Sequence, residues 1–173
     1  VGNNGVGSLA IKGISKDIKD LNLKGSKSNN KFIPELYKKA SAKQRLELLQ
    51  GLMDTDGTIT KDAVSFYSTS EMLINDVQEL VWSLGGYAIK KQYASSKNDK
   101  IKSNFPLFTL HIYINQTVFK LPRKKKSVRY SDRNTRVPIV SIKQIPTVPS
   151  QCIAVDNNSH LFLTNNYIVT HNT

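Results

Sequence analysis

Residues 49–57 read Leu-Gln-Gly-Leu-Met-Asp-Thr-Asp-Gly, an apolar run that ends in two carboxylates and a glycine. Upstream, Ser41 is followed three residues later by Gln44, which is the pattern of a capping box, so we expect a helix to begin there. The apolar residues that follow recur at helical spacing and share one face, namely Leu46, Leu49 and Met53. The segment therefore predicts an amphipathic helix whose last turn carries acidic side chains.

Two features of this helix are unfavourable unless they serve a purpose. Gly51 lies in the helix interior, where glycine costs about 1 kcal/mol relative to alanine, so we expect it to allow close approach of a second helix. Asp54 and Asp56 lie at the helix C-terminus, whose partial negative charge disfavours anions. A bound Mg²⁺ would offset this repulsion, because hard cations take carboxylate and backbone carbonyl oxygens as ligands. The alternative is a plain helix-ending turn.

The stretch at residues 49–57 resembles the signature of the LAGLIDADG homing endonucleases. The resemblance implies that the helix packs against an equivalent helix from a second repeat. It implies that Asp56, with Gly57 beside it, binds Mg²⁺ at the scissile phosphates, and that Asp54 is a structural acid. Lys31 opens a Lys-Phe-Ile-Pro stretch similar to the element that precedes the second such helix in intein endonucleases. Lys31 would then be a charge-stabilising or water-orienting group, although it could equally be an ordinary surface lysine.

Strand and helix patterns follow the motif in regular order. Residues 58–70 alternate apolar and polar side chains around residues 61–62, which is typical of a β-hairpin with its turn. Ser68 and Glu71 repeat the capping-box spacing and predict that a second helix begins there. Glycines 85–86 then predict the end of that helix.

Residues 87–93 and 107–119 predict a second hairpin, which completes an order of helix, strand, strand, helix, strand, strand. This order matches one repeat of the LAGLIDADG fold, so we expect an α+β protein. By the same resemblance, the outer face of the sheet lies in the major groove of double-stranded DNA, where polar side chains read base edges. The candidate contacts are Lys61, Ser65, Tyr67, Lys91, Lys97, Lys100, Lys102, His111 and Tyr113.

Positive charge is concentrated in the middle of the chain. The formal net charge is +12 at pH 7, and residues 87–136 hold thirteen Lys and Arg against two acids. A basic block of this kind favours a polyanionic partner such as nucleic acid, although a solvated surface is the simpler alternative. Within the block we expect residues 120–129, among them Lys124, Lys125 and Arg129, to contact phosphates.

The C-terminal residues carry a different, nearly neutral pattern. It predicts a β segment at residues 136–149, a strand at 152–155 and a turn at 156–158. A second strand at 161–163 and a hairpin turn at 165–166 follow. A last strand, which we expect to be buried, then delivers His171, Asn172 and Thr173. The Asn172 side-chain amide can attack its own backbone carbonyl and so cleave the bond to Thr173. His171 is placed to polarise that carbonyl, and the Thr173 hydroxyl can accept an acyl group.

This terminal pattern resembles the C-terminal splicing motifs of inteins, which belong to the Hint type of domain. The resemblance implies that Asn172 cyclises with help from His171, that His160 serves in proton transfer, and that Thr173 is the first residue of the downstream host protein, the extein. Cys152 lies where many inteins carry an aspartate that coordinates the steps. It could act chemically or only pack in its strand. Splicing itself would need no cofactor.

These resemblances together predict three parts. Residues 1–30 would be a linker or the end of a preceding endonuclease region, residues 31–136 the second LAGLIDADG repeat, and residues 137–173 the splicing segment. No N-terminal splicing motif and no first LAGLIDADG helix is found, so we expect the C-terminal part of a larger or naturally split intein, with the N-terminal half as its partner. The alternative is a free-standing homodimeric LAGLIDADG endonuclease or maturase. The single cysteine and the lack of a long apolar run or signal sequence predict a cytoplasmic protein without a membrane partner.

Overall fold

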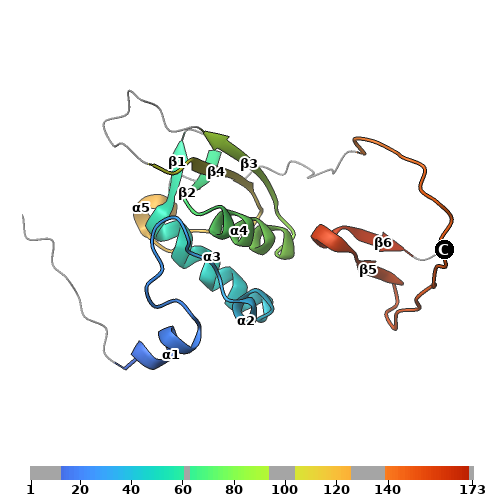
Figure 1. Cartoon of the computed structure of the whole chain (residues 1–173), viewed down its shortest axis with the longest axis horizontal. Helices are drawn as coiled ribbons and strands as arrows, with labels where there is room; N and C mark the ends of the chain where they lie inside the picture. The colour runs from blue at the N-terminus through green and yellow to red at the C-terminus, as the bar shows by residue number, and fades with distance from the viewer. Residues whose placement is uncertain (1–12, 61–62, 94–103, 126–138, 172–173) are drawn as a thin grey trace, which may run out of the picture.

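A helix–strand–strand unit occurs twice in succession and builds a four-stranded antiparallel sheet (Figure 1). The computed structural model describes residues 13–60, 63–93, 104–125 and 139–171. The two units comprise α3 (Ala42–Asp56), β1 (Gly57–Thr60), β2 (Ala63–Ser68), α4 (Glu71–Ser83), β3 (Tyr87–Tyr93) and β4 (Leu107–Tyr113). The strand order is β1-β2-β4-β3. The predicted order of elements is confirmed, although the last strand ends at Tyr113 rather than at residue 119, and the predicted turn at residues 61–62 lies outside the described residues.

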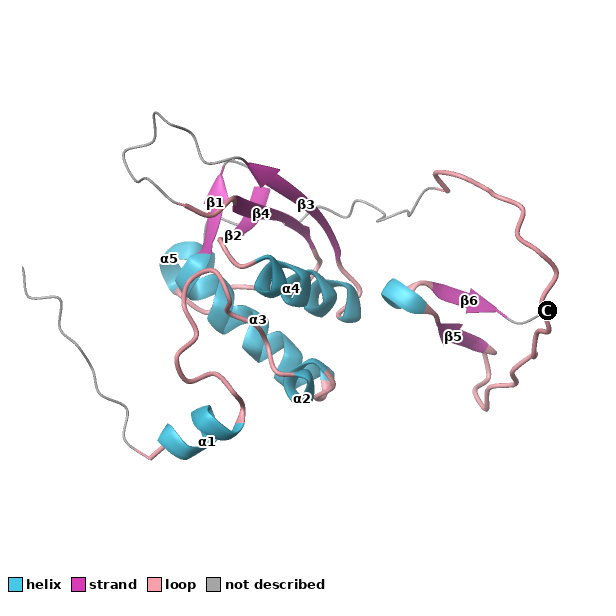
Figure 2. Ribbon diagram, viewed as in Figure 1, coloured by secondary structure: helices cyan, strands magenta, loops and turns pink. Residues whose placement is uncertain are grey.

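Helices α3 and α4 lie on the same side of the sheet and cover one of its faces (Figure 2). Alternate residues of the strands point to that face, and Phe66, Leu110 and Ile112 are buried there. The helices contribute apolar side chains to the same core, and those that are fully or almost fully buried are Leu49, Met53, Ile74, Val77, Leu80 and Val81. Val118 and Phe119 are each 1% exposed and extend this core beyond the end of β4. The core fixes the motif helix against one sheet face, and none of the described helices covers the opposite face.

The two predicted helix starts have different outcomes. At α3 the capping box is confirmed, since the Ser41 hydroxyl accepts from the Gln44 N–H and the Gln44 side chain accepts from the Ser41 N–H. At α4 the prediction is wrong by two residues: Ser70 is the N-cap, and its hydroxyl accepts from the Leu73 N–H. Ser68 still belongs to β2, where it pairs with β4, so its hydroxyl instead accepts from the Ser70 N–H.

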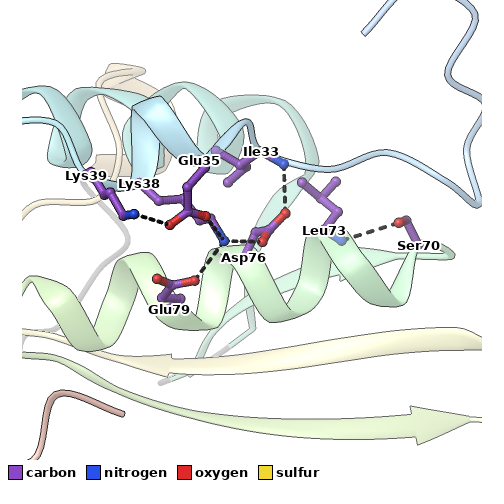
Figure 3. A network of polar contacts seen from close by, with 8 residues as sticks. All are labelled: Ile33, Glu35, Lys38, Lys39, Ser70, Leu73, Asp76 and Glu79. Atoms are coloured by element: carbon purple, nitrogen blue, oxygen red, sulfur yellow. Dashed lines mark hydrogen bonds and ion pairs between the residues drawn. The ribbon is translucent and has the colours of Figure 1, made fainter. Parts of the chain in front are cut away.

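Within the described residues, three short helices flank the repeat: α1 (Ser15–Asp20), α2 (Glu35–Lys38) and α5 (Pro122–Lys125). A polar network ties α2 and the residues before it to α4 (Figure 3). The Lys38 ammonium donates to Asp76 and Glu79 of α4, each at 3.0 Å, and pairs with Glu35 at 3.0 Å. The Ile33 N–H donates to the second Asp76 oxygen at 2.7 Å. Burial opposes the charge of Lys38, but its hydrogen bonds to Glu79, Asp76 and Glu35 outweigh burial and raise its pKa above the ordinary value.

Replacing Asp76 with alanine should lower the free energy of unfolding by about 1.5–3 kcal/mol, because a part-buried ammonium and a backbone N–H both lose an acceptor. Chemical denaturation monitored by circular dichroism measures this change. Glu35→Ala is the matched control: that carboxylate is exposed, so the midpoint should hardly move. Equal midpoints for the two variants would show that the network does not hold the 33–38 segment to α4.

The C-terminal hairpin consists of β5 (Leu161–Leu163), the 3₁₀ turn η1 (Asn165–Tyr167) and β6 (Val169–His171). The predicted strand at residues 161–163 and the turn at residues 165–166 are confirmed, and Asn166 takes a left-handed φ of 61° in that turn. The last strand was expected to be buried, but Val169 of β6 is 59% exposed. Figure 1 places η1 beside α4, which it contacts.

The predictions of a β segment at residues 136–149 and of a strand at residues 152–155 are wrong for the residues that the structure describes. Residues 139–155 form no strand and are mostly exposed, with Val140 at 92% and Ile142 at 87%. Their β-prone composition is not enough, because a strand needs a neighbour to receive its backbone hydrogen bonds, and none of the described strands pairs with them. Cys152 is exposed, so the alternative in which it only packs in its strand is not found, and its chemical role stays a prediction.

The predicted domain boundaries, between residues 30 and 31 and between 136 and 137, stay predictions, and the second falls outside the described residues. Among the helices described, none combines the length and the hydropathy that crossing a bilayer requires.

Candidate functional sites

The carboxylate of Asp54 joins the end of the motif helix to the segment that follows β4. It accepts hydrogen bonds from the Lys120 N–H at 3.1 and 3.2 Å and from the Leu121 N–H at 3.2 Å. The side chain of Gln50, one turn earlier, donates to the Thr117 carbonyl at 2.6 Å. Both contacts hold residues 117–121 against α3, so the Asp54 side chain stabilises the packing of this segment on the helix.

Lys124 closes the C-terminal end of α3 with its ammonium. Nζ donates to the carbonyl oxygens of Met53 at 3.0 Å, Asp54 at 2.8 Å and Gly57 at 2.6 Å. It also lies 5.5 Å from the ring centroid of the buried Phe119. A lysine ammonium has three N–H donors, and all three are used here. The charge of Lys124 therefore faces the helix end, whose partial negative charge it stabilises, and its predicted contact with a phosphate stays a prediction.

The two residues predicted to hold Mg²⁺ do not fit that role in this arrangement. Asp56 is exposed at the end of α3, whereas the Gly57 carbonyl oxygen accepts from Lys124. A divalent ion at that oxygen would lie against an ammonium, which repels it. The described part of the chain also brings together no group of three or more His, Cys, Asp or Glu side chains that could hold a metal. The metal roles of Asp56 and Gly57 stay predictions.

Lys31 is exposed, and its backbone rather than its side chain is held in place. Its carbonyl oxygen accepts from the Ser70 hydroxyl at 2.6 Å, at the N-terminus of α4. In the described structure no hydrogen bond or ion pair joins the Lys31 ammonium to Asp56. Its catalytic role stays a prediction.

The sheet face opposite the helices brings together several residues predicted to contact DNA. Ser65 lies opposite His111, which lies opposite Ile89 on β3. In the next row, Tyr67 lies opposite Thr109, which lies opposite Lys91. Tyr113, also a candidate contact, extends this face along β4. We call the side chains of Tyr67, Lys91 and His111 the outer-face triad. They come from three neighbouring strands, and the register places them on the same side of the sheet.

His111 is held in a defined orientation by Ser65. The Ser65 hydroxyl and His111 Nδ1 are 3.0 Å apart, and Ser65 is fully buried. This contact occupies Nδ1, so Nε2 is the ring nitrogen left for an outside partner. Thr109, beside them on the same face, is 2% exposed, and its hydroxyl has no hydrogen-bond partner in the described structure. At the centre of the face Ser65 and Thr109 are therefore buried, and His111 is the partly exposed polar side chain.

The remaining candidate contacts divide into two groups. Lys125 is exposed on α5, close to the end of the motif helix. The others lie outside the described residues, and this group comprises Lys61, Lys97, Lys100, Lys102 and Arg129. Their predicted contacts with DNA stay predictions.

The C-terminal hairpin brings two histidines together. His171 ends β6 and pairs with Leu161, the residue after His160. The ring centroids of His160 and His171 are 6.3 Å apart and the planes meet at 88°, an edge-to-face arrangement. His160 has a φ of 52°, in the left-handed region, which is uncommon for residues other than glycine, although asparagine, aspartate and histidine enter it more often than the rest. Asn172 and Thr173 lie outside the described residues, and Asn172 directly follows His171 in the chain.

A local hydrogen-bond network holds His160 in this conformation. The Asn157 side-chain oxygen accepts from the Ser159 N–H at 3.1 Å and hydroxyl at 2.9 Å, and its amide donates to the Leu161 carbonyl at 2.8 Å. The His160 N–H donates to the Asn157 carbonyl at 3.1 Å. Asn157 is thus a positioning residue, whereas the sequence pattern predicted it only as part of a turn. The Asn-x-Ser spacing, typical of an Asx turn, was the signal that could have identified it.

The geometry defines a double-layered αββαββ unit whose motif helix ends in acidic residues and whose sheet leaves one face open. Residues 43–133 match the model of the LAGLIDADG-like domain, and the chain belongs to this family. LAGLIDADG domains bind DNA, and members of the family are typically nucleases.

The chain is also similar to a curated protein of Mycobacterium intracellulare named Replicative DNA helicase DnaB. The two are 37% identical over 152 residues, which cover 83% of this chain and 26% of the relative. The chain therefore spans about a quarter of the length of the relative it matches.

Proposed function

We propose that the chain is the C-terminal part of an intein, in which a LAGLIDADG-like domain precedes a splicing segment of the Hint type. The observation that carries the splicing role is the placement of His160 beside His171, immediately before an asparagine and a hydroxyl residue. The left-handed backbone at His160 adds to it, because such conformations persist where the surroundings enforce them and are common at functional sites.

The proposed chemistry is a cyclisation that cuts the chain. The Asn172 side-chain nitrogen forms a bond to the Asn172 carbonyl carbon, the bond from that carbon to the Thr173 nitrogen breaks, and a succinimide results. The attacking nitrogen loses a proton and the departing Thr173 amine gains one, so a pair of histidines that can take and give a proton suits both transfers. In complete splicing, the Thr173 hydroxyl first accepts the upstream host segment as an ester, which later rearranges to a peptide bond.

The partner proposed for this segment is the missing N-terminal half of the splicing domain. Residues 139–148 carry five exposed apolar side chains, which are Ile139, Val140, Ile142, Ile145 and Val148. An exposed segment of apolar, β-prone residues is expected where a strand lacks the sheet with which it would pair. The match to a chain named as a replicative helicase supports an insertion into a helicase precursor, because a helicase has no evident need for a LAGLIDADG-like domain.

For the LAGLIDADG-like domain we propose binding of double-stranded DNA through the sheet face that carries the outer-face triad. Cleavage of both strands would need a second acidic site, since the described chain has a single motif helix. Gly51 lies on an exposed part of that helix, and nothing lies within 4 Å of where its Cβ would be. This opening favours pairing with a second motif helix, from the rest of the intein or from another copy. A homodimeric endonuclease would use the same opening but would leave the hairpin without a role.

A fusion of the full chain to a reporter domain that begins at Thr173 tests the splicing role. We expect slow release of the reporter with a free Thr173 amine, seen on a denaturing gel and confirmed by N-terminal sequencing. Asn172→Ala should abolish the release, because alanine has no side-chain nitrogen to attack the carbonyl. Release at the same rate from the alanine variant would exclude cyclisation as its cause.

A further inference from the structure

We propose that Lys124 is the resident cation at the C-terminal end of α3, and that its ammonium opposes binding of a divalent metal by Asp56 and Gly57. This effect of Lys124 would be independent of splicing and of DNA binding. It concerns the place where the motif resemblance expects an ion and where the structure places a lysine.

The carbonyl oxygens at the end of α3 already form a cation site, and Lys124 fills it. Three of them converge on Nζ within 2.6–3.0 Å, and they come from Met53, Asp54 and Gly57. Backbone carbonyl oxygens are also ligands of Mg²⁺ and other hard cations. Because all three N–H donors of Lys124 point at these oxygens, the ammonium and a metal would compete for the Gly57 oxygen.

Lys124 is held in this position by the segment that carries it. The Asp54 carboxylate receives the N–H groups of Lys120 and Leu121, just before α5 begins. The Phe119 ring is buried in the core and lies under the ammonium. The lysine is therefore preorganised, and moving it aside for a metal would break three hydrogen bonds made by a charged group.

The carboxylates near this site cannot easily recruit a metal against that charge. Asp54 uses its oxygens for the N–H groups of the following segment, which leaves Asp56 as the exposed acid at the helix end. One carboxylate gives a divalent ion few ligands, and Mg²⁺ requires a near-ideal octahedral set. Neutralising Lys124 removes the repulsion and frees the Gly57 oxygen, so it should create the metal site that the wild-type chain lacks.

The test is direct binding of Mn²⁺, whose paramagnetic signal reports the free ion, to the full chain and three variants. Lys124→Met should bind Mn²⁺ at least about tenfold more tightly than the wild type, because the repelling charge is gone. Lys125→Met, which removes the same charge from the exposed neighbour, should match the wild type. Lys124→Met combined with Asp56→Asn should lose the gain. Equal Mn²⁺ affinity in Lys124→Met and the wild type would overturn the proposal.

A second readout is thermal. Without metal, Lys124→Met should melt at a lower temperature than the wild type, because three carbonyl oxygens lose their donor. Mn²⁺ should then raise its Tm and leave the wild type and Lys125→Met unchanged. If Lys124→Met does not fold, the Mn²⁺ affinity of the wild type is compared with that of Asp56→Asn. Equal and weak binding by these two proteins would support the proposal. Tighter Mn²⁺ binding by the wild type than by Asp56→Asn would contradict it.

Discussion

Replacing His160 with alanine is expected to slow the release of a reporter fused at Thr173 by about 10²–10⁴-fold, the range that a positioned acid or base contributes. Its ring lies 6.3 Å from that of His171, the residue that directly precedes Asn172 in the chain. Removing it would leave the departing Thr173 amine without a proton donor held in place. The rate of release on a denaturing gel measures the effect.

Two controls separate this chemistry from a change in the backbone. His160→Asn should keep the left-handed conformation, which asparagine tolerates, and should still be slow because the amide is no acid or base at neutral pH. His111→Ala removes the histidine of the sheet and should release the reporter at the wild-type rate. A fast His160→Asn variant would reduce His160 to a loop-shaping residue.

Replacing the outer-face triad with alanine should weaken binding of target DNA at least about a hundredfold, since each base or phosphate contact typically contributes 1–3 kcal/mol. Tyr67, Lys91 and His111 come from three neighbouring strands and share one sheet face. Loss of the Lys91 charge should also reduce the slope of log K against log salt by about 1. Fluorescence anisotropy over a salt series measures both quantities.

A control with the same residue types lies elsewhere on the chain. Tyr37→Ala, Lys39→Ala and His160→Ala remove one tyrosine, one lysine and one histidine outside the sheet, and all three side chains are exposed. This variant should bind DNA within a few-fold of the wild type. The DNA is recovered by selection from a random duplex library with the wild-type chain. Similar losses in the two triple variants would mean that net charge, and not the sheet face, determines binding.

The fold of residues 42–113 could be predicted because its signals are local. The 3.6-residue stripe of α3, the alternation in β2 and β4, and the glycines after α4 each specify an element without knowledge of its neighbours. The misplaced start of α4 arose because Ser68 and Ser70 both fit a cap, and only the pairing of β2 with β4 decides between them. The missing strands at residues 139–155 show the converse, since β propensity without a pairing partner does not make a strand.

The candidate sites were harder to predict because they depend on distant contacts. The sequence identifies Lys124 only as one cation in a basic run, whereas its role follows from carbonyl oxygens of α3 about 70 residues earlier. The pairing of Ser65 with His111 likewise depends on strand register, which the hairpin patterns do not specify across the sheet. The proximity of His160 and His171 could be predicted from the sequence, because the turn between their strands is short and sets the register of the hairpin.

The most direct measurement of the central claim is the intact mass of the chain released from the fusion at early time points. We predict a product that ends at Asn172 and is one water lighter than the free acid, which is the mass of the succinimide, and which slowly gains that water. A product that carries the free acid from the first time point would show hydrolysis of the bond by another route. An uncut fusion, even in the presence of the N-terminal half, would contradict the splicing role altogether.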